Sequence, residues 1–160
     1  MGVTLIELMF SMGLVALLAG LAAPGFRSGL RAAAVRSATF ELALGLQQLR
    51  ADSIIEARPG LLCPADSGGN CLSSGSDAAG WRSFIEEGST RRQIGGRSLP
   101  SGVVLRATRS PIHFYPASHG ASTGTLTICD AQGVARPRAI VISAVGRARA
   151  DAADPGACES

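Results

Sequence analysis

The sequence predicts an α+β protein, in which a long N-terminal helix, kinked near Pro24, packs on a small antiparallel β-sheet domain. Three features of the chain predict this class. Residues 3–26 are almost entirely apolar, residues 28–58 carry apolar side chains near helical spacing, and residues 59–160 form short segments separated by Gly, Ser, Pro and Asp. The 160 residues suffice for the helix and one small globular domain, not for two.

The apolar segment at residues 3–26 is long enough to cross a bilayer core of about 30 Å as a helix rising about 1.5 Å per residue. Glu7 is its single charged residue. A carboxylate in lipid costs about 2.5–3.5 kcal/mol, so we expect Glu7 to be a functional residue with a partner. Pro24 cannot donate a hydrogen bond to the carbonyl of Gly20, which predicts the kink.

The second half of the predicted helix, residues 28–58, is amphipathic. We expect one apolar stripe to face the globular domain. Its members are Leu30, Ala34, Ala38, Leu42, Leu46, Leu49 and Ile54. Pro59 and Gly60 follow directly and end the helix, because proline has no amide hydrogen with which to continue it. The whole helix would therefore span residues 3–58, about 84 Å at about 1.5 Å per residue.

From residue 59 onward the pattern changes to short apolar segments, which predict the strands of an antiparallel sheet. The expected strands are Leu61–Cys63, Trp81–Glu86, Arg91–Gly95, Val103–Thr108, Ile112–Tyr115, Thr125–Cys129 and Ala139–Ser143. Residues 65–80 are rich in Ser, Gly, Asp and Asn, and so predict an exposed loop.

The chain has four cysteines, which allow three disulfide pairings. Their order along the chain favours Cys63 with Cys71 and Cys129 with Cys158. On the chain-entropy model these bridges would contribute about 2.5 and about 3.6 kcal/mol to stability. A zinc site is the alternative, although the cysteine spacings match no common finger or ribbon. We therefore predict disulfides, with no metal site and no cofactor.

No catalytic motif accompanies these features. The chain lacks the HExxH pair of metalloproteases, a glycine loop that cradles phosphates, and the nucleophile elbow of serine hydrolases. We therefore expect the chain not to be an enzyme.

Positive charge is distributed unevenly along the chain. All fifteen basic residues are arginines, and the net charge is +3. Between residues 81 and 149, however, there are ten arginines and only three acidic residues. Arginine is suited to phosphates and carboxylates, because its guanidinium group is a planar fork of hydrogen-bond donors.

Two pairs of arginines stand at the ends of the last predicted strand: Arg136 with Arg138, and Arg147 with Arg149. If the backbone is extended after Gly146, the side chains of Arg147 and Arg149 point the same way, about 6.6 Å apart along the strand. They would then project together and bind an anion. The alternative is that these arginines protect a sheet edge against aggregation, which is a common use of charge at an edge.

The N-terminal motif Gly2-Val3-Thr4-Leu5-Ile6-Glu7-Leu8 resembles the processing site of the type IV pilin family. The resemblance implies that a prepilin peptidase cleaves between Gly2 and Val3, and that the new amine of Val3 is methylated. It also implies that Glu7 helps subunits to register during assembly. Four residues at about 1.5 Å each place that amine only about 6 Å from Glu7 along the helix axis.

The same resemblance implies a domain organisation and a location. Residues 1–2 would be the leader, residues 3–27 the transmembrane and filament-core half of the helix, and residues 28–160 a periplasmic globular domain. The protein would cross the bacterial inner membrane once and then enter a type IV pilus on the cell surface. Its expected partners are the prepilin peptidase, the inner membrane before assembly, and other major and minor pilins.

Further motifs resemble the GspH/FimT group of minor pilins and pseudopilins. They are Leu62-Cys63-Pro64, Gly80-Trp81, the strand ending in Ile140-Val141-Ile142-Ser143, and a late cysteine. FimT members that serve natural transformation carry a C-terminal Gly-Arg-x-Arg motif implicated in DNA binding, and Gly146-Arg147-Ala148-Arg149 matches it. The resemblance therefore implies a minor pilin that binds double-stranded DNA for uptake. The DNA-binding residues would be Gly146, Arg147 and Arg149, with Arg136 and Arg138.

Two other functions stay open at this point. The chain could be a FimU-like structural minor pilin that primes pilus assembly, or a GspH-like pseudopilin of type II secretion. Pilus genes or secretion genes beside its own gene would separate the pseudopilin from the two pilins.

Overall fold

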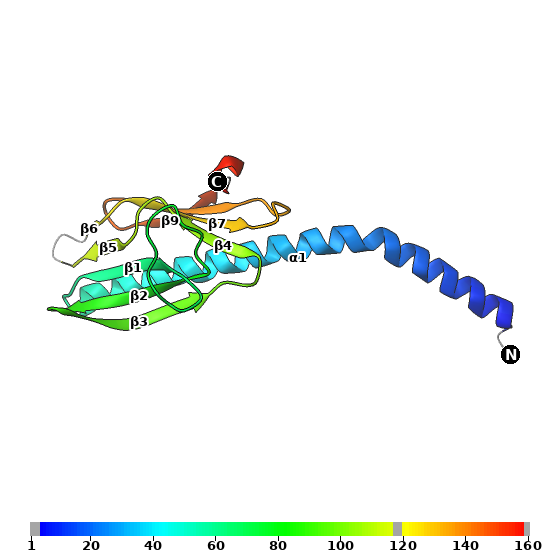
Figure 1. Ribbon diagram of the computed structural model, residues 1–160, viewed down its shortest axis with the longest axis horizontal. Helices are drawn as coiled ribbons and strands as arrows, with labels where there is room; N and C mark the ends of the chain where they lie inside the picture. The colour runs from blue at the N-terminus through cyan, green and yellow to red at the C-terminus, as the bar shows by residue number, and fades with distance from the viewer. Residues whose placement is uncertain (1–3, 117–119, 159–160) are drawn as a thin grey trace.

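The computed structural model describes residues 4–116 and 120–158, and it has the α+β class that the sequence predicts (Figure 1). Within these residues, one long helix, α1 (Leu5–Ile55), is followed by nine strands and a short 3-10 helix, η1 (Pro155–Cys158). The C-terminal half of α1 packs on the strands, and its N-terminal half extends away from them (Figure 1). The globular part is therefore built on one half of a single helix.

The buried face of α1 is set by apolar residues three or four positions apart, which lie on one side of a helix. Its fully buried members are Val35, Ala38, Leu42, Leu46 and Leu49. Two members of the predicted stripe lie outside this face, because Leu30 is 56% exposed and Ile54 is 41% exposed. Both stand about 120° around the helix from its centre at Leu42, at about 100° per residue. The buried stripe is thus shorter and narrower than predicted.

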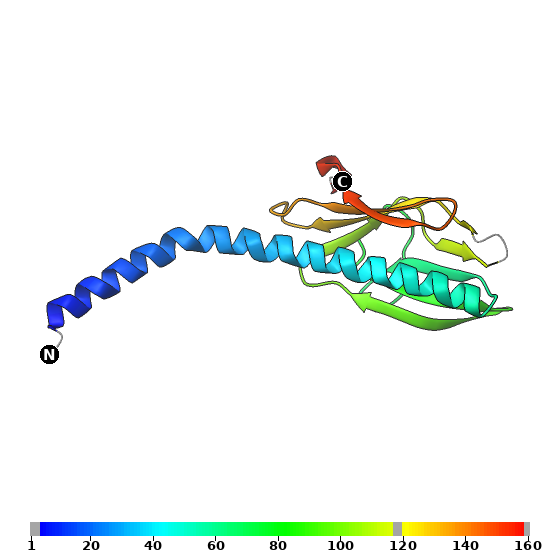
Figure 2. The ribbon, with the colours of Figure 1, turned by 180° about the vertical axis from the view of Figure 1, so that it is seen from behind.

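The helix is continuous through Pro24, but Figure 2 shows it changing direction in its N-terminal half. A change of direction in this half agrees with the predicted kink, since a proline within a helix removes one hydrogen bond. Within the described part of the chain, no helix is apolar over a long enough stretch to cross a membrane.

The C-terminal end of α1 is at Ile55, three residues before the predicted end at 58. Ala57 has a positive φ of 53°. Its amide donates to the carbonyl of Ile54, and the next amide donates to the carbonyl of Ser53. This pair of hydrogen bonds is the Schellman arrangement, in which a left-handed residue terminates a helix. The chain therefore turns before it reaches the proline that was expected to stop the helix.

The strands form two antiparallel sheets. The first has five strands in the order β3-β2-β1-β5-β6. They are β1 (Gly60–Ala65), β2 (Gly80–Glu87), β3 (Thr90–Ser98), β5 (Ile112–Tyr115) and β6 (Gly120–Ala121). The second has four strands in the order β4-β7-β8-β9. They are β4 (Val103–Ala107), β7 (Gly124–Asp130), β8 (Arg138–Ile142) and β9 (Ala148–Ala152).

The helix lies against both sheets. Figure 2 shows α1 crossing in front of them, with β3 of the five-stranded sheet, in green, on one side of the helix and the four-stranded sheet on the other. Apolar side chains of the helix and of both sheets form one core, with Leu62, Ile85, Leu105, Phe114, Leu126 and Ile140 at its centre. Because β9 is the last strand of its sheet and contacts α1, an edge strand lies beside the helix.

All seven predicted strands are present, with ends that differ by at most three residues. Strands β6 and β9 were not predicted. β6 has only two residues, and β9 alternates alanine with charged residues, so neither has an apolar pattern that indicates a strand. Strand β9 is extended because it pairs with β8. The register runs from Ile142 opposite Ala148 to Arg138 opposite Ala152.

Both predicted disulfides are present, Cys63–Cys71 and Cys129–Cys158. The pairing uses all four cysteines, which leaves no free thiol for the alternative zinc site. The first bridge ties the loop after β1 back to that strand. The loop is also anchored further along, because Ala78 is fully buried and exchanges backbone hydrogen bonds with Leu105. The predicted exposed loop is therefore exposed only between its anchors.

The indole of Trp81 on β2 packs directly on α1 at Gly45. A β-carbon at Gly45 would overlap the indole ring, and Trp81 is only 6% exposed. We expect Gly45→Ala to lower the free energy of unfolding by about 1–3 kcal/mol, because the helix and the ring must move apart. Chemical denaturation of the oxidised protein measures this change.

The matched control is Gly29→Ala, which makes the same substitution in the same helix where the β-carbon has open space. Alanine is a better helix former than glycine, so this variant should be as stable as the wild type or more stable. If Gly45→Ala were equally well tolerated, the close packing of β2 on α1 would be disproved.

Candidate nucleic-acid interface

The predicted site residues Gly146, Arg147 and Arg149 belong to the hairpin that joins β8 to β9. The amide of Gly146 donates to the carbonyl of Ser143 at 2.8 Å, and the amide of Ser143 donates to the carbonyl of Arg147 at 3.0 Å. Gly146 has a φ of +73°, so the loop is a tight turn closed by a left-handed residue. Glycine suits this position, because other residues adopt the conformation at a cost of about 1–2 kcal/mol.

The sequence suggested that Arg147 and Arg149 lie on one extended strand, but they do not. Strand β9 begins at Ala148, so Arg147 belongs to the turn, whereas Arg149 lies on the strand opposite Val141. Both arginines are exposed and line the same groove of about 470 Å³ between the hairpin and α1. The turn therefore brings the two residues to one place, although not through strand geometry.

A third arginine, Arg50 of α1, lines the same groove. Its Nε atom lies 3.3 Å from the position that a β-carbon on Gly146 would occupy. The guanidinium group of Arg50 therefore lies directly against the turn, in space that the glycine leaves open. We refer to Arg50, Arg147 and Arg149 as the hairpin cluster.

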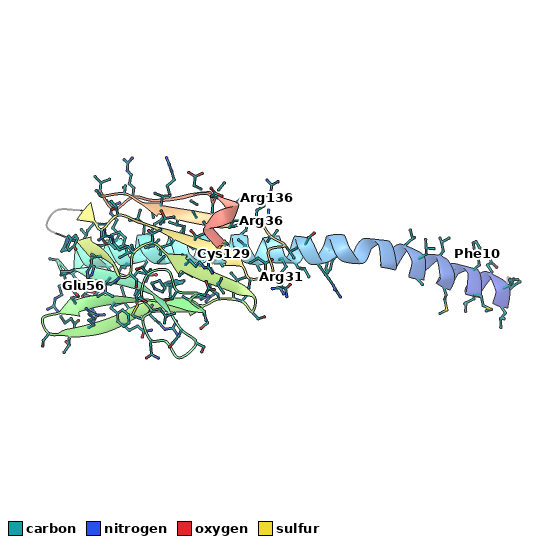
Figure 3. All side chains as sticks on the ribbon, turned by 45° about the horizontal axis from the view of Figure 1, so that its top comes forward. Phe10, Arg31, Arg36, Glu56, Cys129 and Arg136 are labelled. Atoms are coloured by element: carbon teal, nitrogen blue, oxygen red, sulfur yellow. A yellow bond between two sulfur atoms is a disulfide. The ribbon has the colours of Figure 1, made fainter. Side chains whose placement is uncertain are left out.

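Arg136 and Arg138, the other predicted pair, lie at the opposite end of β8 and do not join the hairpin cluster. They line a second groove of about 430 Å³ together with Arg36 of α1. Figure 3 shows Arg36 and Arg136 close together at the end of the globular part nearest the N-terminal half of α1. We refer to Arg36, Arg136 and Arg138 as the loop cluster.

Five of these six arginines form no ion pair with any residue in the ranges 4–116 and 120–158. The exception is Arg149, whose guanidinium lies 3.6 Å from the carboxylate of Asp151. Their side chains are 79% and 54% exposed. Such a pair in open solvent contributes at most about 1 kcal/mol. Both clusters therefore keep most of their positive charge.

The arginines of β3 are, by contrast, held by carboxylates. Arg92 donates to Glu56 and to Glu87 at 2.6 Å each. Arg97 donates to Glu41 at 2.8 Å. The hydrogen bond from Arg92 lowers the pKa of Glu87 below its ordinary value, so that carboxylate is charged at neutral pH. These arginines are neutralised locally, which distinguishes them from the two clusters.

The two grooves are chemically suited to anions. Guanidinium groups without carboxylate partners offer paired N–H donors to phosphate oxygens. Aromatic residues do not line either groove, so neither offers a surface on which bases could stack. In the described ranges, no three metal-ligating side chains come together.

Two members of the clusters, Arg36 and Arg50, were not singled out from the sequence. Their spacing contains a signal, because fourteen residues are nearly four helical turns and place both side chains on the same side of α1. Which side of α1 meets the hairpin, however, is decided by tertiary packing.

The chain has relatives of known fold. Residues 38–146 match the model of the family described as Type II transport protein GspH. The structure resembles the type IV minor pilin FimU of Pseudomonas aeruginosa, with a TM-score of 0.54 and 16% identity over 72% of this chain and 91% of that one. It also resembles the minor pseudopilin EpsH of Vibrio cholerae, with a TM-score of 0.58 and 10% identity over 74% of this chain and 96% of that one. No curated protein matches the chain.

The contact between the turn and Arg50 can be tested with Gly146→Ala. The backbone strain should cost about 1–2 kcal/mol. Displacing Arg50 from its preferred rotamer should add about 0.5–1.5 kcal/mol. The free energy of unfolding, measured by chemical denaturation, reports the sum.

Gly133→Ala is the matched control, because Gly133 also has a positive φ, of 68°, but has open space where the β-carbon would be. It should lose only the stability that the backbone strain removes. An equal loss in the two variants would show that Arg50 is not held against the turn.

Proposed function

Because the chain belongs to the Type II transport protein GspH family, we propose that it is a minor type IV pilin of the FimT kind, which binds extracellular double-stranded DNA for uptake in natural transformation. The observation that carries this proposal is the hairpin cluster. Three arginines line one groove. The one ion pair that they form with a described residue, between Arg149 and Asp151, is weak and exposed. Duplex DNA presents one negative charge per about 1.7 Å of its axis, and so complements such a groove.

Binding is to phosphates, with little sequence preference. Reading bases requires an element that enters a DNA groove and reaches the base edges. The hairpin cluster instead combines a helix side chain, a turn and an edge strand. Phe40 and Tyr115 are exposed aromatic residues, but they lie outside both grooves, so stacking on single strands is disfavoured. The expected ligand is therefore the backbone of a duplex.

A few phosphate contacts give each subunit a weak and salt-dependent affinity. Weak binding is compatible with capture, because several copies in a filament can hold one polymer at the same time. Gly146 would shape the turn that presents Arg147, and Arg136 and Arg138 would assist from the other end of β8.

The N-terminal half of α1 fits the proposed assembly into a pilus. Leu5, Ile6 and Phe10 are each more than 70% exposed, and Figure 3 shows Phe10 far from the globular part. We expect this half to lie first in the inner membrane, with the globular domain in the periplasm, and later in the filament core beside other pilins. Gly2 and Val3 lie outside the described residues, so cleavage by a prepilin peptidase and methylation stay predictions.

A second candidate function is that of a pseudopilin in type II secretion, which the family description and the likeness to EpsH favour. The likeness to FimU would equally suit a structural minor pilin that primes assembly. Deleting the gene separates the three functions: loss of transformation alone supports DNA uptake, loss of pili supports priming, and loss of protein secretion supports the pseudopilin.

Replacing Arg147 and Arg149 together by alanine should weaken DNA binding by removing two phosphate contacts. The magnitude of d log K/d log[salt] should fall by about 1.8, at about 0.9 for each phosphate contact. Thermal stability should change little, because both residues are exposed. The full chain in a neutral detergent, titrated with a labelled duplex at several salt concentrations, gives these slopes.

The control for net charge is Arg27→Ala/Arg109→Ala, which removes two exposed arginines outside both grooves. This variant should keep the wild-type slope. No binding by the wild-type chain, or equal slopes for all three proteins, would end the DNA-binding proposal and return the hairpin arginines to the role of edge protection.

Glu7 should act in filament assembly and not in folding. It lies in the first turn of α1, far from the core that begins at Val35. Glu7→Ala should therefore leave the denaturation curve unchanged while lowering the amount of this subunit in sheared pili. The variant Glu7→Asp, which keeps the carboxylate, is the control. Normal incorporation of Glu7→Ala would contradict the role inferred from the N-terminal motif.

A further inference from the structure

The hairpin cluster and the loop cluster lie along one face of α1. Arg36 belongs to the loop cluster and Arg50 to the hairpin cluster. Fourteen residues separate them, so they lie on the same side of the helix, about 21 Å apart along its axis. Each helix arginine thus marks one end of a common surface.

The strands give a similar separation independently. Arg138 is the first residue of β8, and Arg147 is paired with Ser143, just beyond the other end of that strand. Five residues of extended chain span about 17 Å. Figure 2 shows β9, in orange-red, running beside the cyan part of α1 on the side that faces the viewer. The two clusters therefore stand at the two ends of a ribbon, β8 and β9, that lies beside the helix.

The helix adds no opposing charge on this face. Glu41 is the only acidic residue of α1 between Arg36 and Arg50. Five residues from Arg36 correspond to about 140° of rotation, which places Glu41 elsewhere on the helix. There it binds Arg97 of the five-stranded sheet at 2.8 Å. A polyanion that reaches from one cluster to the other meets no carboxylate from α1 in between. The carboxylate on the ribbon itself, Asp151 of β9, lies 3.6 Å from the guanidinium of Arg149.

We propose that one DNA duplex lies along this face and contacts both clusters at once, with Arg36 and Arg50 as phosphate-binding residues in addition to the predicted set. The inference rests on the proposed function and adds its footprint, which is the length of duplex that one subunit contacts. At about 3.4 Å per base pair, a separation of about 21 Å corresponds to about six base pairs. Duplex DNA is stiff over such a length, because its persistence length is about 150 base pairs. It can therefore bridge two fixed clusters, whereas a small anion can occupy only one.

The footprint predicts how steeply binding depends on salt. Each phosphate contact contributes about 0.9 to the magnitude of the salt slope. Removing two contacts, in Arg36→Ala/Arg50→Ala, should lower that magnitude by about 1.8. Between 50 and 200 mM salt, the wild type should then lose about 12-fold more affinity than the double variant.

The experiment titrates the full chain, in neutral detergent, with a labelled duplex of twenty base pairs. It compares the wild type, Arg36→Ala/Arg50→Ala, Arg147→Ala/Arg149→Ala and the charge control Arg27→Ala/Arg109→Ala. All three variants remove two positive charges, so an effect of net charge alone would be the same in each. We expect a smaller salt slope for the first two variants and the wild-type slope for the charge control.

A second ligand tests whether the two clusters act together. A DNA hairpin with a stem of three base pairs is about 10 Å long, shorter than either estimate of the separation, and reaches one cluster at a time. Arg136→Ala/Arg138→Ala leaves the hairpin cluster intact, so it should weaken binding of this short stem by no more than about twofold, the loss of one of two separate sites. With the twenty-base-pair duplex, the magnitude of the salt slope should be about 1.8 lower for this variant than for the wild type.

The possible failures are distinguishable. If the wild type does not bind DNA, the proposed function fails and the footprint fails with it. If Arg147→Ala/Arg149→Ala loses slope but Arg36→Ala/Arg50→Ala behaves like the charge control, the footprint is wrong and the proposed function stands. Equal loss for short and long DNA in Arg136→Ala/Arg138→Ala would also overturn the bridging of two clusters.

Discussion

The buried stripe of α1, from Val35 to Leu49, is the contact on which the rest of the structure depends. It packs on strands of both sheets, so a single helix face holds the two sheets in fixed relative positions. The close approach of Trp81 to Gly45 shows how little space separates the helix from β2. The edge strand β9 pairs with β8 and lies beside the same helix.

The same helix also sorts the arginines. On one flank, Glu41 stands about 100° around the helix from Leu42 and neutralises Arg97 of the five-stranded sheet. On the other flank, Arg36 and Arg50 stand about 80–120° from Leu42, beside the grooves of the four-stranded sheet. One flank thus supplies a carboxylate to an arginine, whereas the other adds positive charge to arginines whose one ion pair with a described residue is the exposed contact of Arg149 with Asp151. The helix therefore creates a neutral side and a positive side.

Local patterns explain what could be predicted from the sequence. Periodicity placed the helix and seven strands, and cysteine order favoured the two disulfides that the structure has. The end of α1 was missed because the left-handed residue that ends it is Ala57, whereas this position is usually a glycine that can be recognised in the sequence. Strand β9 was missed because its extended form comes from pairing with β8. Arg50 was missed because it meets Gly146 across ninety-six positions of sequence, a contact that only the tertiary fold decides.

Clustered arginines repel one another, so something must hold them together before an anion arrives. Rigid elements do this for the hairpin cluster: Arg50 belongs to a packed helix, Arg149 to a strand paired with β8, and Gly146 to a closed turn. The Cys129–Cys158 bridge then ties the segment after β9 to β7, and on the chain-entropy model it contributes about 3.6 kcal/mol to the stability of the folded protein. Because folding has already met the cost of bringing the charges together, a phosphate finds its donors in place and loses less affinity to ordering. The weak, exposed contact of Arg149 with Asp151 is the only ion pair in the described part of either cluster, and a phosphate can displace it at little cost.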